Sequence, residues 1–393
     1  MTYEREMNHK KNHAVARLAD VASRAGVSQT AASFALSSGP RSKKVSRRTR
    51  ELVVSAAKEL NYLPNQVAQA LRRQRTGTVG IIFPDFYADW AQRVMEGLDR
   101  ALDPHGIVPL IARDSWNPQR QRQEILSLVG RQVDGLILAA PMAENMSLLS
   151  DTQGKGTPIL FFGETPTGRN TFSYVVWNEG KAVELATRYL FESGRRRVWF
   201  VNPGSVATEH LAQSRARVSA FERTAKKIRQ SSEFNSLVIH FSSGSAVGEN
   251  IADMLAGGTH PKPDAILACN DLLGRQIMES LLGRGVKIPD ELAVMGLCNH
   301  PISASRSVSL SSVHQPLEEM AFVAGESMMN LIARPNSGRV AVMLDAEKLC
   351  VRNSTAVVGS GSQSVAGEDS DIHTNYENGP SAAASDSNGA PKK

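Results

Sequence analysis

The chain has 393 residues, of which 41% are hydrophobic and 21% are charged. This length allows two or three domains with a large core, and the composition is that of an ordinary globular protein. The three cysteines form neither a disulfide framework nor a metal-ligand spacing, which favours a reducing cytoplasm. The polar N-terminus and the lack of any apolar run near the roughly 18–20 residues of a membrane span argue against an exported or membrane protein.

The positive charge is concentrated at the N-terminal end of the chain. The net charge of the whole chain is +6 at pH 7. Residues 1–75 hold 15 Lys and Arg against five Asp and Glu, a net charge of +10, whereas the remainder holds 30 against 34. This distribution indicates a polyanionic partner for the first segment, although solvated basic surfaces are also common without one.

A pair of short helices is predicted after a polar, aperiodic tail at residues 1–15. One helical face is marked by apolar residues at i, i+3, i+4 and i+7, namely Leu18, Val21, Ala22 and Ala25. Gly26 can adopt the positive φ that ends a helix, and Ser28 is a good N-cap for a second helix over residues 29–36. The pattern predicts a helix-turn-helix, whose second helix can enter a DNA major groove; an ordinary helical hairpin is the alternative.

Two further helices are predicted in this basic segment. The third begins after Ser46 and stops at Asn61, and its expected buried face consists of Leu52, Val53, Ala56, Ala57 and Leu60. The fourth covers residues 66–72 and follows Asn65 as N-cap. It is shorter than the roughly 12–15 residues that an isolated helix needs for marginal stability. We expect it to form only when DNA and a partner chain supply contacts, and a plain linker is the alternative.

From Thr78 onward, short apolar runs alternate with longer amphipathic segments. Strands are expected over residues 79–83, 107–111, 136–140, 159–162, 173–177, 197–201, 236–241, 265–269, 292–297 and, as one final strand region, 340–351. Helices are expected over residues 88–103, 118–131, 144–153, 179–193, 211–230, 246–256, 271–283 and 316–333. This α/β alternation indicates parallel sheets covered by helices, in two similar halves with a cleft between them. Residues 359–393 are rich in Ser, Gly, Ala and Asp and are expected to be disordered.

Seven stretches of the sequence carry the pattern of one protein family. The N-terminal stretches are LADVASRAGVS, VSRRTRELV and ELNYLPNQVAQAL, and the later ones are TGTVG, AILACND, VKIPDELAVMG and LSSVHQP. Over about residues 16–357 the chain therefore resembles the lactose-repressor/galactose-repressor family of bacterial transcriptional regulators. One departure is the loop over residues 38–44, which is longer than usual and carries Arg41, Lys43 and Lys44.

The resemblance implies an α/β protein with an all-α helix-turn-helix headpiece and an effector domain of periplasmic-binding-protein-like fold, built from two subdomains with parallel sheets. The implied boundaries are a flexible tail at 1–15, the headpiece at 16–64, a hinge at 65–76, the effector-binding and dimerisation domain at 77–358 and a disordered tail at 359–393. The chain is expected to cross between the subdomains near residues 177, 314 and 343.

The resemblance also implies which headpiece residues contact DNA. Gln29 and Thr30 stand where family members read base edges; Gln can pair with adenine, and Thr can contact a thymine methyl group. Phe34 stands where Arg is common, and it either contacts a thymine methyl group or packs on the headpiece core. Leu71 matches a hinge leucine that wedges into the minor groove. The positions matched to phosphate contacts are Ser28, Ser33, Ser46, Thr49 and Tyr62. The other matched positions are Leu18, Asn65 and Ala68.

In the cleft, the resemblance implies effector contacts from Trp90, Arg217, Asn270, Asp271, Cys298 and Gln315. Sugar-binding members often carry acidic residues at three cleft positions, which are Gly163, Trp177 and Cys298 here. A thiol replaces a carboxylate at Cys298, so the positive charge of Arg217 is expected to be less balanced than in those members. The expected ligands are an anionic metabolite held by Arg217 or a flat molecule against Trp90. A cleft that binds nothing, and a structural salt bridge for Arg217, are the alternatives.

The sequence lacks the usual enzyme motifs. Both phosphate-binding loops, G-x-G-x-x-G after a strand and G-x-x-x-x-G-K-[ST], are absent, as are H-E-x-x-H and G-x-S-x-G. Accordingly, no catalytic residue, metal or cofactor is expected. The resemblance implies a cytoplasmic bacterial repressor that binds a double-stranded DNA operator as a homodimer or higher oligomer. A small-molecule effector, sugar-like or anionic, is the second expected partner. A periplasmic-type solute-binding module and a sugar-active enzyme are the alternatives.

Overall fold

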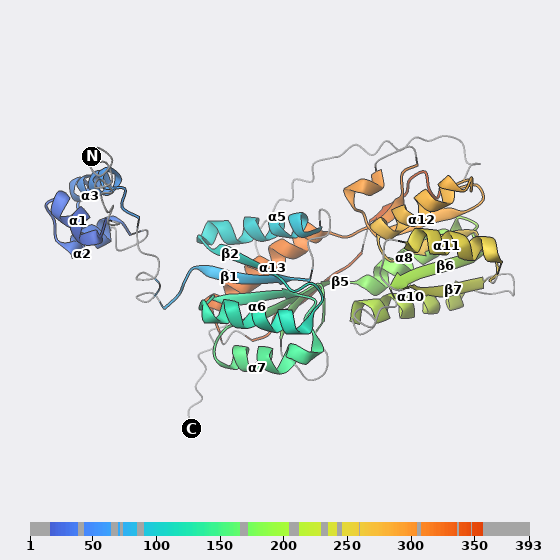
Figure 1. Cartoon of the computed structure of the whole chain (residues 1–393), viewed down its shortest axis with the longest axis horizontal. Helices are drawn as coiled ribbons and strands as arrows, with labels where there is room; N and C mark the ends of the chain where they lie inside the picture. Colours follow the sequence, from blue (N-terminus) through green and yellow to red (C-terminus); the bar gives the residue numbers. More distant parts are fainter. Residues whose placement is uncertain are drawn as a thin grey trace, which may run out of the picture. The chain divides into compact units, whose positions relative to one another are not determined.

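The computed structural model of the protein describes residues 16–37, 43–63, 70, 74–84, 90–165, 172–203, 212–228, 235–241, 246–258, 260–304, 308–335, 338–346 and 348–356. Both expected tails lie outside these residues, as do Asn65, Ala68 and Leu71 of the expected hinge helix. The described segments form a three-helix headpiece and a body with two sheets, shown in Figure 1.

The headpiece consists of α1 (Leu18–Arg24), α2 (Gln29–Ala35) and α3 (Arg47–Glu59). Its core is made of small and β-branched side chains, namely Val21, Ala22, Ala32, Ala35, Val53, Ala56 and Ala57. Gly26 has a φ of 64° at the turn between α1 and α2. The expectation that Leu52 lies in the buried face of α3 is wrong, because this side chain is 49% exposed. Residues 53, 56, 57 and 60 follow the i, i+3, i+4, i+7 spacing, and Leu52 falls outside this stripe.

The first lobe of the body is built on a six-stranded parallel sheet with the strand order β11-β5-β4-β3-β1-β2. The strands are β1 (Thr78–Phe83), β2 (Val108–Arg113), β3 (Gly135–Ala139), β4 (Ile159–Phe162), β5 (Ser173–Trp177) and β11 (Ala341–Leu344). The strands β3 and β4 are buried along their whole length. Burial on both faces requires helices on both sides of the sheet.

Two pairs of helices cover this sheet. One face packs against α5 (Trp90–Leu102) and α13 (Leu317–Ala333), and the other against α6 (Pro118–Gly130) and α7 (Met146–Gly154), as Figure 1 shows. At Gly97 a Cβ atom would collide with the carbonyl oxygen of Glu318 and the side chain of Ala321. A glycine is therefore needed for the close approach of α5 to α13.

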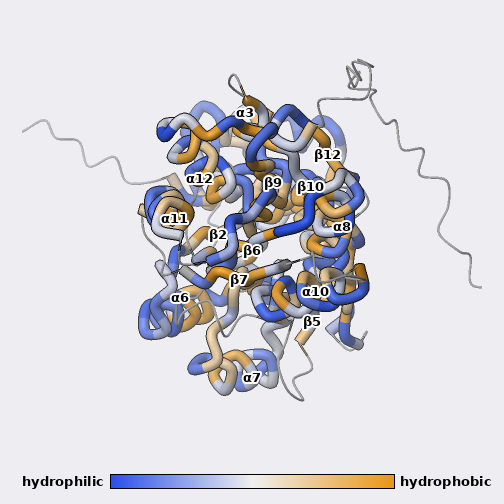
Figure 2. Tube along the Cα trace, turned by 90° about the vertical axis from the view of Figure 1, so that its right-hand side faces the viewer, coloured by the Kyte–Doolittle hydropathy of each residue, from blue (hydrophilic) through white to orange (hydrophobic). Residues whose placement is uncertain are grey.

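The second lobe has the strand order β12-β10-β9-β8-β6-β7. Its strands are β6 (Arg197–Pro203), β7 (Asn235–Phe241), β8 (Ala265–Ala268), β9 (Ala293–Cys298), β10 (Ser311–His314) and β12 (Leu349–Cys350), and its helices are α8 (Glu179–Glu192), α10 (Ala212–Ile228), α11 (Val247–Gly257) and α12 (Asp271–Gly283). All neighbouring strands are parallel except β12, which runs antiparallel to β10. Hydrophobic and hydrophilic residues alternate along α10 and α11 in Figure 2, as expected for helices that cover a sheet on one side.

The chain passes between the two sheets three times: between β5 and α8, between β10 and α13, and between β11 and β12. The α/β class with parallel sheets is confirmed. The expected single strand region over residues 340–351 is wrong, because it contains two strands that belong to different sheets. The strand β10 was not expected, because its first two residues are serines that are buried through hydrogen bonds rather than through apolar character.

Candidate functional site

Helix α2 presents two polar side chains at its N-terminus. Oγ of Ser28 accepts a hydrogen bond from the amide of Ala31 at 3.2 Å, which fixes the start of the helix at Gln29. Gln29 and Thr30 follow directly and are exposed, whereas Ala32 is buried in the headpiece core. Both side chains are therefore accessible, as is required for the contacts with base edges that are expected of them.

Phe34 and Ser33 lie half-buried on the same helix. The ammonium nitrogen of Lys44, from the loop before α3, lies 5.8 Å from the centroid of the Phe34 ring, within the range of a cation–π interaction. Part of the ring is left accessible, so the base-contacting and core-packing alternatives for Phe34 are both compatible with its position.

The remaining headpiece positions have structural partners. Oγ of Ser46 accepts a hydrogen bond from the amide of Thr49 at 3.1 Å and lies 2.9 Å from its hydroxyl oxygen, so this serine caps α3. Leu18 and Tyr62 pack partly buried against the headpiece core. Arg47, Arg48 and Arg50 are exposed in the first turn of α3 and make this part of the headpiece surface basic.

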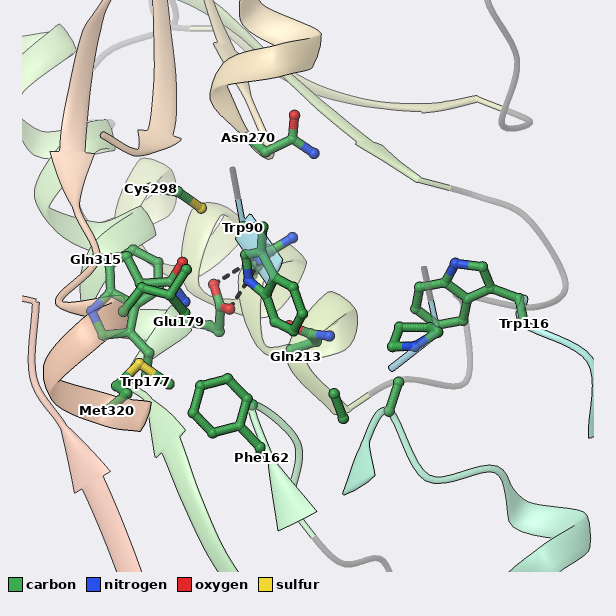
Figure 3. Close-up of a pocket in the computed structure, with 16 residues that line it drawn as sticks. Trp90, Trp116, Phe162, Trp177, Glu179, Gln213, Asn270, Cys298, Gln315 and Met320 are labelled. Carbon is green, nitrogen blue, oxygen red and sulfur yellow. Dashed lines mark hydrogen bonds and ion pairs between the residues drawn. The ribbon is translucent and has the colours of Figure 1, made fainter. Parts of the chain in front are cut away.

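A cavity of about 280 Å³ lies between the two lobes, at the ends of their strands (Figure 3). It is lined by Pro84, Trp90, Trp116, Ala139, Ala140, Phe162, Gly163, Trp177, Glu179, Gln213, Arg217, Asn270, Cys298, Gln315, Leu317 and Met320. The first lobe contributes aromatic rings and small apolar residues, whereas the second lobe contributes most of the polar side chains. The cavity thus has one apolar wall and one polar wall.

The apolar wall is held in place by aromatic contacts. The indole of Trp90, at the start of α5, meets the ring of Phe83 with 5.6 Å between centroids and an interplanar angle of 84°. It meets Phe162, at the end of β4, at 6.1 Å and 61°. Edge-to-face contacts of this kind restrict the ring, so Trp90 projects into the cavity in a fixed orientation (Figure 3).

Trp116 reaches the cavity from an unusual turn after β2. Ser115 and Trp116 have φ values of 54° and 57°, in the left-handed region that residues other than glycine seldom adopt. The buried carboxylate of Asp114 holds this turn: it accepts hydrogen bonds from the amide of Trp116 at 2.9 Å and from the side chain of Gln121 at 2.7 Å. Strained backbone of this kind persists where the surroundings enforce it, and here it places an indole at the cavity.

The polar wall is centred on an ion pair between Glu179 and Arg217. Nε and Nη2 of Arg217 donate to the two carboxylate oxygens of Glu179 at 2.8 and 3.0 Å, and the side chains are only 13% (Arg217) and 8% (Glu179) exposed. Burial acts to lower the pKa of Arg217, but the charge and hydrogen bonds of Glu179 outweigh it and raise the pKa, so the guanidinium stays charged. The expectation that the charge of Arg217 is poorly balanced is therefore wrong.

Local sequence explains how the two charged groups meet. Asn178 caps α8 by accepting a hydrogen bond from the amide of Lys181 at 3.0 Å, which places Glu179 in the first turn, where the helix dipole favours a carboxylate. Arg217 lies on α10, which packs against α8, and Gln213 precedes it by one turn on the cavity side.

Cys298 and Asn270 complete the polar wall. Cys298 ends β9 with a φ of 94°, and burial raises the pKa of its thiol well above the usual value, so the group is neutral. Asn270 caps α12 by accepting a hydrogen bond from the amide of Leu273 at 2.8 Å. Asp271, the next residue, does not line the cavity; its carboxylate accepts hydrogen bonds from Ser312 and from the amide of His300.

Five of the six expected effector residues line the cavity: Trp90, Arg217, Asn270, Cys298 and Gln315. Gly163 and Trp177, the positions where family members carry acidic residues, line it as well. The sequence reasoning missed Trp116, Phe162, Glu179, Gln213 and Met320. Trp116, Phe162 and Glu179 lie at or just after the carboxyl ends of strands, where open parallel sheets bind ligands, so strand positions alone could have drawn attention to them.

The described part of the chain contains no group of three or more His, Cys, Asp and Glu side chains placed to hold a metal ion. Among its described helices, none has the length and apolar character needed to cross a membrane.

Comparisons with known proteins agree with this architecture. Residues 17–65 match the family described as bacterial regulatory proteins, lacI family, and residues 187–355 match the periplasmic binding protein-like domain. The HTH-type transcriptional regulator GntR of Pseudomonas aeruginosa is 28% identical over 80% of this chain and 89% of its own. The HTH-type transcriptional repressor PurR of Vibrio atlanticus is 25% identical over 81% of this chain and 92% of its own.

A solved structure of the Lac repressor dimer, bound to operator and the anti-inducer ONPF, has a TM-score of 0.75 with 19% identity, and the match covers 87% of this chain and all of that one. The headpiece with its exposed second helix, the two-lobed body and these matches agree with one another. The chain belongs to the lacI family of bacterial regulatory proteins, which are DNA-binding transcriptional regulators and not enzymes.

Proposed function

We propose that the protein is a repressor that binds a pseudo-palindromic operator as a homodimer and responds to a small molecule in the cavity between the lobes. The observation that carries this proposal is the exposed start of α2, where Gln29 and Thr30 follow the Ser28 cap on a headpiece with a basic surface. The chain would act on bacterial DNA in the cytoplasm.

The dimer and the operator symmetry rest on the relatives. The Lac repressor, whose fold this chain shares, is described as a dimer on its operator. A symmetric dimer reads two half-sites related by the same symmetry, so the operator is expected to be a pseudo-palindrome. Asn65, Ala68 and Leu71 lie outside the described residues, so the DNA contacts of Asn65 and Ala68 and the minor-groove role of Leu71 stay predictions.

Effector control is supported by the residues at the connections between the lobes. Glu179 follows the first crossing of the chain, and Gln315 lies on the second, and both line the cavity. Asn178 and Lys181 donate to the carboxylate of Asp345 at 2.8 and 2.6 Å, which ties the first crossing to the third. A ligand in the cavity therefore contacts both lobes and their connections, and can favour one arrangement of the lobes over another.

Selection of bound fragments from random DNA, followed by titration of the selected site, tests the proposal. The full chain should select a two-fold site and bind it much more tightly than random DNA, with affinity falling steeply as salt rises. Gln29→Ala should relax the preference at one position of each half-site, at a cost of about 1–3 kcal/mol.

Ser55→Ala provides the control, because Ser55 is exposed on the third helix and its hydroxyl donates only to Glu59 of that helix among the hydrogen bonds of the described headpiece. This variant should keep the site preference of the wild type. Equal affinity for selected and random DNA at moderate salt would rule out a sequence-specific regulator.

A further inference from the structure

Building on the proposed function, we propose that the effector is a planar, uncharged aromatic molecule with a hydrogen-bonding edge, and neither a simple sugar nor an anionic metabolite. Its ring would lie on the first lobe and its polar edge on the second.

The first lobe offers a ligand mainly ring surface. Trp90 at the start of α5, Trp116 in the turn after β2 and Phe162 at the end of β4 line one cavity. Trp90 is restrained by two aromatic neighbours, so its indole does not need to be ordered when a ligand binds, and the strained turn after β2 places Trp116 at the same cavity. Pre-ordered aromatic walls favour a planar ring that can stack on them.

The second lobe offers hydrogen bonds without net charge. The amide of Gln213, the amide of Asn270 and the Glu179–Arg217 pair face the cavity from this side. Among the described lining residues, Glu179 and Arg217 are the two that carry charge, and each neutralises the other. A neutral ligand edge with donors and acceptors suits this wall.

An anionic ligand fits poorly, because the Glu179 carboxylate already binds the guanidinium of Arg217 and neutralises its charge. Two of its nitrogens donate to Glu179, and a carboxylate or phosphate that approached them would also approach the Glu179 carboxylate. Like charges in a site of low polarity repel each other strongly. The anionic alternative drawn from the sequence therefore loses its basis.

A simple sugar fits poorly because it carries hydroxyl groups around its whole rim. On the side of the first lobe the hydroxyls would face Pro84, Ala139, Ala140 and Phe162, whose side chains offer no hydrogen-bond partner. The tryptophans of this wall add only indole N–H donors, such as the buried one of Trp177, and no acceptor. Polar groups that lose water without gaining a partner weaken binding. The cavity of about 280 Å³ is roughly twice as large as a cavity of about 150 Å³ that holds benzene, so it accommodates about two rings, either fused or linked.

Calorimetric titration of the full chain with matched compounds tests this inference. The neutral aromatic probes are uridine, para-hydroxybenzyl alcohol and phenyl β-glucoside, which represent nucleobase, phenolic and aryl-glycoside sources. Dihydrouridine and methyl β-glucoside are the non-aromatic counterparts, and uridine monophosphate and para-hydroxybenzoate are the anionic ones. At least one neutral aromatic probe should bind, at least about tenfold more tightly than its counterparts.

Three results would overturn the inference: tighter binding of methyl β-glucoside, tighter binding of an anionic counterpart, or saturable binding by none of the aromatic probes. Operator binding by the same preparation separates these failures from a failure of the proposed function. Intact operator binding with no aromatic binding would refute only the effector class, whereas absent operator binding would refute the regulator itself.

Substitution of Glu179 tests the charge argument directly. Glu179→Gln leaves the positive charge of Arg217 uncompensated, so the anionic counterparts should gain at least about tenfold in affinity relative to their neutral partners. The matched control is Glu184→Gln, on the same helix, where the lost carboxylate pairs with Arg188 at an exposed position. An unchanged ratio in Glu179→Gln would contradict the neutral-cavity argument.

A second pair of variants tests the aromatic wall without disturbing the ion pair. Trp116→Leu should lower the affinity for the bound aromatic probe by about tenfold. Phe322→Leu is the control, because that ring stacks with Arg100 and lies outside the cavity. Equal affinities in both variants would show that the Trp116 ring does not contact the ligand.

Discussion

The hydroxyl of Ser312 donates a hydrogen bond of 2.6 Å to one carboxylate oxygen of Asp271, and the other oxygen accepts one of 2.6 Å from the amide of His300. This contact joins β10 to the start of α12 and to the loop that follows Cys298. Asp271 is only 1% exposed, and burial raises the pKa of its carboxyl from 3.8 to about 6 despite these hydrogen bonds.

The raised pKa of Asp271 predicts a pH-dependent contribution to stability. The fold favours the protonated carboxyl, so this contribution is complete below about pH 4 and is lost as the pH rises through about 6. The difference in free energy of unfolding between wild type and Asp271→Asn should fall by about 3 kcal/mol between pH ~4 and pH ~7. Urea denaturation of both proteins across this range measures it, and a constant difference would contradict the shift.

The buried pair of Glu179 and Arg217 predicts a strongly non-additive double substitution. Glu179→Leu should lower the free energy of unfolding by about 3 kcal/mol, because it leaves a buried guanidinium without its partner. Adding Arg217→Met should recover most of that loss, since a hydrophobic pair can replace a buried ion pair at little cost. The exposed control Glu184→Leu should cost less than about 1 kcal/mol. Additive losses in the double variant would contradict this account.

The cap at Ser28 predicts that headpiece stability and DNA affinity can be separated. Ser28→Ala should destabilise the headpiece by about 1 kcal/mol and weaken operator binding. Ser28→Asn and Ser28→Asp should both restore the cap and the stability. Only the Asn variant should restore operator binding, because the Asp carboxylate would repel the nearby phosphates. Thermal melts and operator titrations give the two readouts, and identical operator affinities for Asn and Asp would contradict a phosphate-facing Ser28.

Two glycine substitutions should affect the stability of the body differently, because Gly97 lies at the contact between α5 and α13 and Gly130 does not. Gly97→Ala should destabilise the body by at least about 2 kcal/mol, because its methyl group would collide with Glu318 and Ala321. Gly130→Ala, at the exposed end of α6 with open space around it, should be neutral or stabilising by up to about 1 kcal/mol. Comparable losses of stability in both variants, measured by urea denaturation, would show that the packing at Gly97 is not tight.

Local chemistry made much of the fold predictable. Ser28 and Ser46 cap the helices that follow them, and several expected elements agree with the structure to the residue, including β4, β5 and α12. These features depend on neighbours within a few positions, which one sequence displays directly.

The polar wall of the cavity could not be predicted in the same way. Glu179 precedes Arg217 by 38 residues, and their meeting depends on how α8 packs against α10. The expected unbalanced charge of Arg217 failed for this reason: acidic residues were expected at positions 163, 177 and, above all, 298, whereas the carboxylate that pairs with Arg217 belongs to Glu179. The buried serines of β10 were missed for a related reason, since their partners Asp271 and Thr355 are remote in sequence.

The three crossings of the chain have a consequence for the order in which the protein can fold while it is being synthesised. The headpiece helices end at Glu59, so this unit is complete early. The first lobe begins next, but α13 and β11, which cover α5 and complete its sheet, come from residues 317–344. Its apolar face on α5, including Val94 and Leu98, therefore stays uncovered until nearly the whole second lobe has left the ribosome. The lobe that is translated first is thus the last to complete its core, and a message truncated before residue 317 would encode the headpiece helices on a body that cannot close its core.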